Sequence, residues 1–146
     1  MAITADFTIT YDTDVRVPFV IWDGDGLTDD ELQAQIDAGT ARRKDLTGAT
    51  IAFYLRKKVN TPDPPLIYKS TETSPSGVSV DGTFGGSPDQ IVYVTFEDTD
   101  TYDPTSSPVV NVKPGRYPYA LKELGDGIET ILARGTVTVE LTAGWE

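Results

Sequence analysis

The chain predicts a mainly β protein, an antiparallel β-sandwich that forms one domain over residues 1–146 and carries one short inserted helix at about residues 29–38. Seven or eight short segments alternate apolar and polar residues, as half-buried strands do, and turn residues separate them. One segment carries the end signals of a helix, and the strand–helix–strand rhythm of a parallel sheet is missing. Such patterns are typical of the immunoglobulin-like sandwich, with a closed barrel as the alternative.

Residues 114–141 hold the clearest pattern, two alternating strands joined by Gly125, Asp126 and Gly127. Gly-rich turns of this kind connect antiparallel strands tightly. The apolar residues expected on one face are Tyr117, Tyr119 and Leu121 in the first strand, and Ile131, Ala133, Val137, Val139 and Leu141 in the second. We therefore expect a long hairpin that closes a sheet.

Two more strands are expected at the start of the chain. Odd-numbered residues are apolar over 3–11, the period of a half-buried strand. The second segment places Val15, Val17, Phe19 and Ile21 on one face, with Val20 and Trp22 on the other. Because Pro18 has no N–H to donate, this strand should lie at a sheet edge or carry a bulge.

The helix is predicted from its ends. Thr28 followed by Glu31 forms a capping box, and Gly39 is a suitable stop. The apolar stripe is narrow, with Leu32, Ile36 and Ala34. We expect a lid between two strands that needs something to pack on, because so short a helix is marginal alone.

Four further strands are expected at residues 49–58, 66–69, 78–80 and 90–96. The last is continuously apolar, which indicates a central strand. Residues 60–90 and 97–115 are rich in loop-forming residues. Residues 99–104 could form one helical turn, but irregular structure is expected there.

The composition excludes several kinds of functional site and partner. The chain has 23 acidic and 12 basic residues, a net charge of −11, and neither histidine nor cysteine. The absence of cysteine and histidine excludes disulfides, thiolate nucleophiles and imidazole bases. The negative net charge argues against a nucleic-acid partner. No apolar run approaches the ~20 residues that span a bilayer, and residues 1–4 do not resemble a secretion signal. We expect no membrane segment and no cofactor.

The acidic segment 23–31 suggests a metal site, with Asp23, Asp25 and Asp29 as weak candidate ligands. Closely spaced carboxylates around glycines can wrap a calcium ion. The EF-hand register fails, because its first and bidentate places fall on Ile21 and Leu32. The interpretation favoured is a turn that leads into an acid-capped helix, and no metal is expected.

Two short basic runs, residues 42–44 and 56–58, are interpreted as a solvated loop and strand end rather than phosphate sites.

An aromatic set could line a sugar site, although aromatic residues at strand positions are more often core. Its members are Tyr93, Phe96, Tyr117, Tyr119 and Trp145. No nucleophile–base pair or carboxylate pair stands out for catalysis, so we expect no enzyme, and a hydrolase using two carboxylates is the least favoured hypothesis.

Four segments taken in order resemble small virion structural proteins of tailed bacteriophages. They are residues 46–56, residues 91–94 with the acidic Asp-Thr turn that follows, residues 114–121 and residues 132–139. The pattern is similar to the immunoglobulin-like N-terminal domain of baseplate upper proteins, and to accessory tail, neck and capsid-decoration proteins. The resemblance covers about two-thirds of the chain and rests on strand and turn patterns.

The resemblance implies a non-enzymatic structural component of a virion, assembled in the bacterial host cytoplasm. It would dock in many copies as a capsid decoration (cement) protein or a tail, neck or baseplate accessory protein, with major capsid or tail proteins as partners. Repetition supplies avidity without one strong contact. The alternative is a carbohydrate-binding or calcium-dependent adhesion module.

Self-association is also expected, as a homo-oligomer such as a trimer or as a monomer that orders on a symmetric lattice. The edge strand and the loop segments leave apolar and unpaired groups at the periphery. The expected contact residues are Pro18, Leu66, Ile67, Tyr102 and Trp145.

Overall fold

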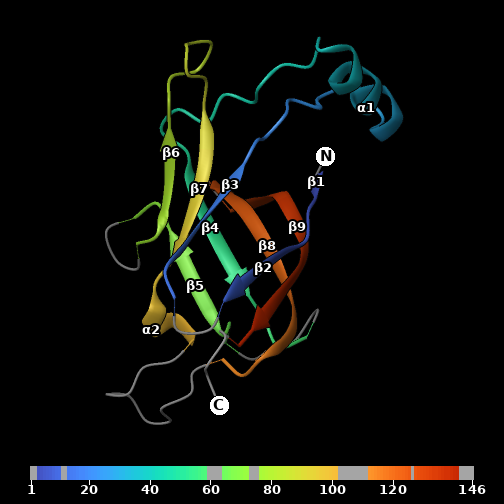
Figure 1. Ribbon diagram of the computed structural model, residues 1–146. Coiled ribbons are helices and arrows are strands. Elements are labelled where there is room, and N and C mark those ends of the chain that lie inside the picture. The colour runs from blue at the N-terminus through green and yellow to red at the C-terminus, as the bar shows by residue number, and fades with distance from the viewer. Residues whose placement is uncertain are drawn as a thin grey trace.

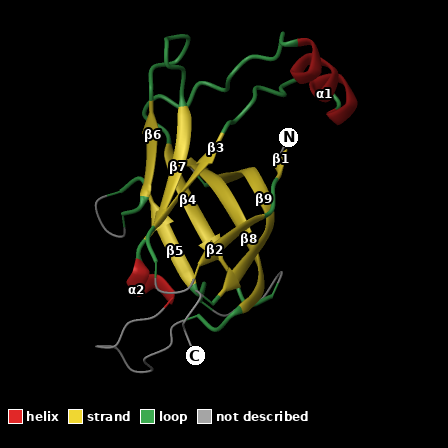
Figure 2. Ribbon diagram, viewed as in Figure 1, coloured by secondary structure: helices red, strands yellow, loops and turns green. Residues whose placement is uncertain are grey.

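The computed structural model describes residues 3–10, 13–58, 64–72, 76–101, 112–125 and 127–141. The protein is mainly β, with a curled mixed sheet and a smaller antiparallel sheet (Figure 1). The mixed sheet has the order β1-β9-β8-β4-β5, with β2 also paired to β9, and the second sheet has the order β3-β7-β6. Figure 2 shows the two helices at opposite ends of the molecule.

The elements have the following bounds. The mixed sheet contains β1 (Ile3–Thr4), β2 (Phe7–Thr10), β4 (Thr50–Leu55), β5 (Ile67–Ser70), β8 (Gly115–Gly125) and β9 (Ile128–Glu140). The second sheet contains β3 (Val15–Phe19), β6 (Val78–Asp81) and β7 (Ile91–Phe96), and the helices are α1 (Asp29–Ala38) and α2 (Asp98–Thr101).

The long hairpin is confirmed, but one of its faces was assigned wrongly. A bulge between Leu121 and Lys122 pairs Leu121 with Ala133 and Lys122 with Ile131, so Leu132 is the extra residue. Beyond a bulge the inward and outward positions exchange. Leu132 is therefore buried, whereas Ile131, which was expected on the same face as Ala133, is 38% exposed. Leu141, expected on that face too, follows the end of β9 and is 48% exposed.

The expectation of purely antiparallel pairing is wrong at one edge. The predicted first strand is split into β1 and β2, and both run parallel to β9. Side-chain alternation reports which face is buried but does not report the direction of the neighbouring strand. Between β1 and β2, the Ala5 amide donates to the Arg134 carbonyl and the Thr136 amide donates to the Asp6 carboxylate.

The second sheet follows the sequence pattern closely. Strand β7 is central, as its continuous apolar run predicted, and Val92 and Val94 are buried. Strand β3 lies at the edge, as Pro18 predicted, and Pro18 is exposed. The structure has the short helix α2 where irregular structure was expected, so that expectation is wrong at Asp98–Thr101.

A single core fills the space between the two sheets. It combines buried residues of the mixed sheet, such as Ile9, Phe53 and Leu121, with Phe19 and Phe96 of the second sheet. The ring of Phe53 lies 5.2 Å from that of Phe96 and 5.4 Å from that of Tyr119. Aromatic contacts at these distances add to the stabilisation from buried apolar area.

Helix α1 has the predicted bounds and caps but does not cover a sheet as a lid. Thr28 Oγ1 accepts from the Glu31 amide, Glu31 accepts in return from the Thr28 amide, and Gly39 ends the helix with φ 73°. Only Leu32 of the helix is buried. The helix stands outside the two sheets at the end of an arm, which we define as residues 22–43 (Figure 1).

The base of this arm is firmly tied to the body. A β-bridge joins Trp22 to Arg43 and the Asp23 amide donates to the Arg42 carbonyl, so the two ends of the arm are joined to each other, and the Arg43 guanidinium donates to the Gln90 carbonyl of the body. The side chain of Gln90, which precedes β7, accepts from the Leu46 amide and donates to Thr47 Oγ1, at 2.9 and 3.1 Å. Neither helix in the described part of the chain is long and apolar enough to cross a membrane.

We predict that Thr28→Ala destabilises α1 by about 1 kcal/mol, because the Glu31 amide loses its acceptor. Hydrogen exchange of the α1 amides should accelerate while the β7 and β8 amides keep their protection. Thr28→Ser keeps the hydroxyl and serves as the control. Loss of protection throughout both sheets would contradict the independence of the arm.

We predict that Gly135→Ala destabilises the fold by about 1–3 kcal/mol, because a Cβ there would overlap the carbonyl oxygen of Ala5 between β1 and β2. Gly127→Ala is the matched control. Gly127 also has positive φ but has no atom within 4 Å of an added Cβ, so its cost is backbone strain alone. Denaturant unfolding that gives equal losses for the two variants would contradict the close approach at Gly135.

Candidate functional site

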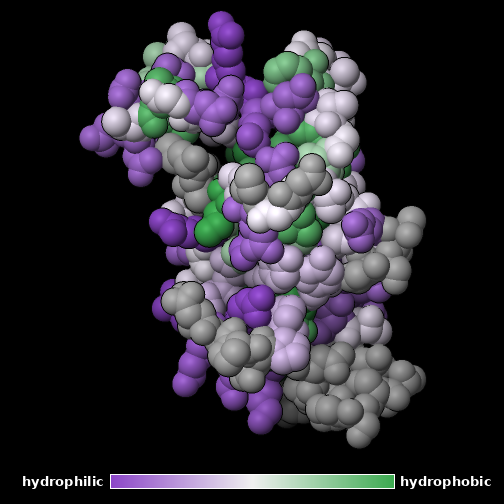
Figure 3. Space-filling view, turned by 180° about the vertical axis from the view of Figure 1, so that it is seen from behind, coloured by the Kyte–Doolittle hydropathy of each residue, from purple (hydrophilic) through white to green (hydrophobic). Residues whose placement is uncertain are grey.

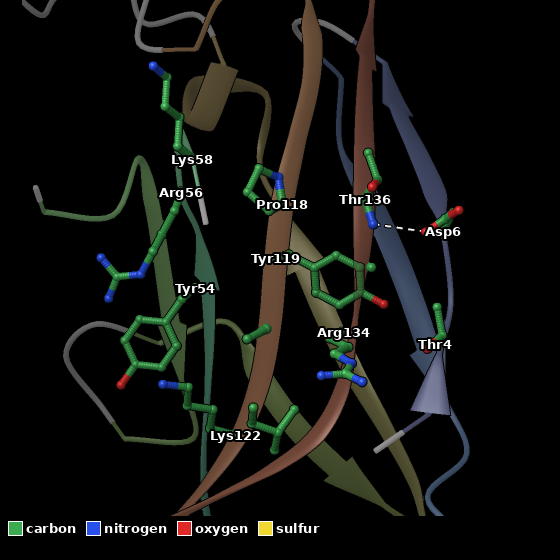
Figure 4. A pocket seen from close by; sticks show the side chains of 13 residues that line it. Thr4, Asp6, Tyr54, Arg56, Lys58, Pro118, Tyr119, Lys122, Arg134 and Thr136 are labelled. Atoms are coloured by element: carbon green, nitrogen blue, oxygen red, sulfur yellow. Dashed lines mark hydrogen bonds between the residues drawn. The ribbon is translucent and has the colours of Figure 1, made fainter. Parts of the chain in front are cut away.

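The outer face of the mixed sheet carries an open groove of about 670 Å³ (Figure 4). It is lined from β4 by Tyr54 and from β8 by Pro118, Ala120 and Lys122. The remaining lining residues are Thr4, Asp6, Arg56, Lys58, Tyr119, Ile131, Arg134, Gly135 and Thr136. Strand alternation explains this assembly, because every second residue of each strand points away from the core.

The charge of the groove is opposite to that of the whole chain. Its lining contains four basic residues, Arg56, Lys58, Lys122 and Arg134, and one acidic residue, Asp6. In the part of the chain that the structure describes, Lys58 and Arg134 form no ion pair. Clustered cations in a hollow raise the local concentration of anions even when the net charge is −11.

Tyr54 lies between two of these cations. The Arg56 guanidinium carbon is 5.5 Å from the centre of the Tyr54 ring, and Lys122 Nζ is 5.2 Å from it. The Tyr68 ring of β5 meets Tyr54 edge-on at 5.0 Å. Burial, followed by the neighbouring Tyr68, raises the pKa of Tyr54 to about 12. Its hydroxyl is therefore a neutral donor at physiological pH.

The floor of the groove is apolar because of the bulge in the hairpin. Ile131 lies opposite Lys122, on the outer face, only because Leu132 is the extra residue. Ala120 pairs with Tyr54 on one side and with Arg134 on the other, so these three residues form one row across the sheet. The cations thus surround a floor that can accept apolar or aromatic groups.

The other wall is held by β1 and β2. The Asp6 carboxylate accepts from the Thr136 amide at 2.9 Å, which Figure 4 shows as a dashed line. The Tyr119 hydroxyl donates to the Ala5 carbonyl, and burial, with the Asp6 carboxylate, raises the pKa of Tyr119. Asp6, the single acidic residue of the lining, is therefore already hydrogen-bonded to the protein backbone.

The chemistry that this arrangement supports is anion binding. Guanidinium and ammonium groups donate charge-assisted hydrogen bonds to carboxylate, sulfate or phosphate oxygens. The Tyr54 ring and the Ile131 side chain add apolar contact beside those charges. A ligand with anionic groups attached to an apolar or flat body would match both features.

The sequence interpretation missed this groove. It treated residues 56–58 as a solvated strand end, but Arg56 and Lys58 line the groove together with Lys122 and Arg134. The available signal was strand phase, because Tyr54, Arg56 and Lys58 share one face of an expected strand. No local pattern joins those residues to Arg134, which is far away in the sequence.

The acidic turn does not gather its carboxylates around one point. Asp23 Oδ1 accepts from the Asp25 amide at 3.1 Å, and the Arg42 side chain shares the hollow formed by Asp23 and Asp25. Asp29 lies in the first turn of α1 instead. Within the described ranges there is no group of three or more acidic, histidine or cysteine side chains that could hold a metal ion.

The expected contact residues are in different environments. Pro18 is exposed on the edge strand β3, and Leu66 is half-buried before β5. Ile67 is in the core, 5% exposed, so it does not belong to the free surface. Tyr102 and Trp145 lie outside the described residues.

The aromatic set proposed for a sugar site is largely structural. Phe96 and Tyr119 are buried, and Tyr117 packs against the core. Tyr93 lies under the Arg16 guanidinium, 3.6 Å from its carbon, while Arg16 also pairs with Asp81 at 2.5 Å. Trp145 is not among the described residues. The aromatic residue of the groove is Tyr54.

Comparisons with protein-family models and with curated proteins find no match to this chain. The candidate site is therefore argued from its geometry and charge.

We predict that Tyr54 keeps its proton at pH 11 in the folded protein, because its pKa is raised to about 12. A rapid pH jump should ionise fewer tyrosines in the native chain than in guanidinium, and Tyr54→Phe should remove one late-ionising group. The pKa of Tyr54 in the folded chain exceeds the unfolded value of about 10, so the protonated Tyr54 contributes to the free energy of unfolding. This contribution is complete below pH 10 and is lost as the pH rises towards 12. An unchanged number of late tyrosines in Tyr54→Phe would contradict the assignment.

Proposed function

We propose that this protein is a non-enzymatic structural component of a bacteriophage virion. It docks in many copies on the particle as a capsid decoration protein or as a tail, neck or baseplate accessory protein. The observation that carries the proposal is the pair of docking features on one small domain, namely the arm that stands outside the sheets and the basic groove on the mixed sheet. The virion itself comes from the resemblance of the strand and turn patterns.

The architecture supports this role. Two sheets enclose one core, which agrees with a sandwich of immunoglobulin-like type as the finer description of the fold. Such a body can present loops and an arm at its ends while the core stays intact. Arm residues 23–38 are held by helix caps and by the ties at its base rather than by the sheets.

The partners proposed are major capsid or tail proteins, together with further copies of this chain as a homo-oligomer, for example a trimer. A repeated lattice multiplies weak contacts, so each docking site needs only modest affinity. The net charge of −11 keeps the free chains apart until they meet complementary sites.

The groove also favours a second candidate function, an adhesion module that binds acidic carbohydrate. Tyr54 offers a flat face for a sugar ring, and Arg56 and Lys122 lie beside that ring to contact carboxylate or sulfate groups. This candidate uses the groove but leaves the arm without a role, so we rank it second.

We predict that the chain is present in purified mature particles of the phage that encodes it. Peptide mass spectrometry should give a copy number that matches a symmetric site, and immunogold labelling should place the label on the head or the tail. Infected-cell lysate, in which the chain is made, is the positive control. Detection in the lysate together with absence from mature particles would overturn the proposal.

The second candidate is separated by a glycan array and by calorimetry with and without calcium. Binding of acidic glycans that Arg134→Glu abolishes and Lys113→Glu preserves would support the adhesion module. Lys113 is an exposed residue before β8 that does not line the groove.

A further inference from the structure

Among the residues that the structure describes, none covers the outward face of α1. Leu32 is buried, and Gln35 and Ile36 are half-buried, so these three residues form the inward face. The opposite face contains Asp30, Gln33, Ala34, Asp37 and Ala38, all of them exposed. It combines two carboxylates with small alanine side chains, which allow another surface to approach closely.

The segment that carries this face is acidic, and two of its acids, Asp30 and Asp37, lie on the face itself. Residues 23–38 contain six acidic residues and no basic residue, namely Asp23, Asp25, Asp29, Asp30, Glu31 and Asp37. The groove lining has four basic residues against one acid. The two surfaces are therefore complementary in charge within a chain that is acidic overall.

The spacing of the charges agrees as well. Asp30 and Asp37 are seven residues apart, about 10 Å along the same face of the helix. Arg56 is in register with Pro118 and Thr136 on the next two strands, and Arg134 lies two residues before Thr136. Two strand spacings and two residues place the Cα atoms of Arg56 and Arg134 about 12 Å apart. Long, flexible basic side chains can close this difference.

The apolar parts match in the same orientation. Ala34 lies one turn from Asp30 and is flanked by the two carboxylates. Between Arg56 and Arg134 the groove presents Pro118 and Ala120 of β8, with the Tyr54 ring beside them. A helix seated with Asp30 and Asp37 on the cations would therefore place Ala34 over the apolar floor.

A molecule does not fill its own groove with its own arm. Helix α1 lies beyond the end of the sheets in Figure 1, and the groove lies on the outer face of the mixed sheet. In Figure 3 the arm stands out from the body at the upper left, with a largely hydrophilic surface. The occupant that fits is thus the arm of another molecule.

We propose that the Asp30, Ala34 and Asp37 face of α1 in one copy binds the basic groove of a second copy. The inference builds on the proposed assembly role and names the partner, a second copy of this chain. Two different surfaces meet, so the contact is head-to-tail, and its repetition gives a closed ring or an open filament. Packing against the groove also stabilises a helix that is marginal alone.

The experiment is analytical ultracentrifugation of the full chain at 0.15 M salt, where charges further apart than about 8 Å are screened. The weight-average mass should rise with concentration. Two double variants should each weaken self-association at least tenfold. One reverses the arm (Asp30→Lys with Asp37→Lys), and the other reverses the groove (Arg56→Glu with Arg134→Glu). Circular dichroism verifies that both variants fold.

Matched controls change net charge by the same amount elsewhere. Glu97→Lys with Glu140→Lys changes two exposed acids outside the arm, and Lys57→Glu with Lys113→Glu changes two exposed bases outside the groove lining. Both controls should still self-associate. If a control loses association as its reversed counterpart does, net charge rather than the arm–groove contact is responsible, and the proposal is overturned.

The decisive measurement mixes the two reversed variants. The basic arm of one variant fits the acidic groove of the other, and the native acidic arm of the second fits the native basic groove of the first. Neither variant matches itself, so the mixture should regain association, with the two variants alternating in the complex. A native chain that stays monomeric at all concentrations, a mixture without complex, or variants that still self-associate would overturn this inference. The detection of the chain in particles tests the virion role separately, so the two failures can be told apart.

Discussion

The pairing of β9 along both of its edges is the constraint on which the rest of the structure depends. Strand β8 pairs with one edge of β9, from the pair of Gly115 with Val139 to the pair of Gly125 with Ile128. Strands β1 and β2 run parallel to β9 along its other edge. Because β8 also pairs with β4, and β4 with β5, the hairpin fixes the register of the whole mixed sheet. The core is then one face of this sheet closed by β3, β6 and β7.

The bulge opposite Leu121 connects stability to the candidate site. It sends Leu132 into the core and leaves Ile131 on the outer face, within the groove. Without the extra residue the second half of the hairpin would present its side chains to the opposite faces. The same irregularity therefore completes the core on one side of the sheet and supplies the apolar floor between the cations on the other.

The arm shows how local interactions can order a segment that the core does not cover. Its helix has reciprocal capping hydrogen bonds at Thr28 and Glu31, acids in its first turn and Gly39 at its end. The Trp22–Arg43 bridge joins the two ends of the arm to each other, and the Arg43 guanidinium, which donates to the Gln90 carbonyl, joins the arm to the body. The acidic arm and the basic groove thus separate opposite charges within one chain, which gives the proposed arm–groove contact its direction.

The sequence by itself determined the elements that depend on neighbours in the chain: the capped helix at residues 29–38, the faces of β3, the central strand β7 and the hairpin at residues 114–141. Capping and alternation are local, so they can be read from consecutive residues. Only the tertiary structure decided the parallel pairing of β1 and β2, the phase change at Leu132 and the position of the arm outside the sheets. It also decided the groove, because Arg56, Lys122 and Arg134 meet only when three strands from distant parts of the chain are paired in register.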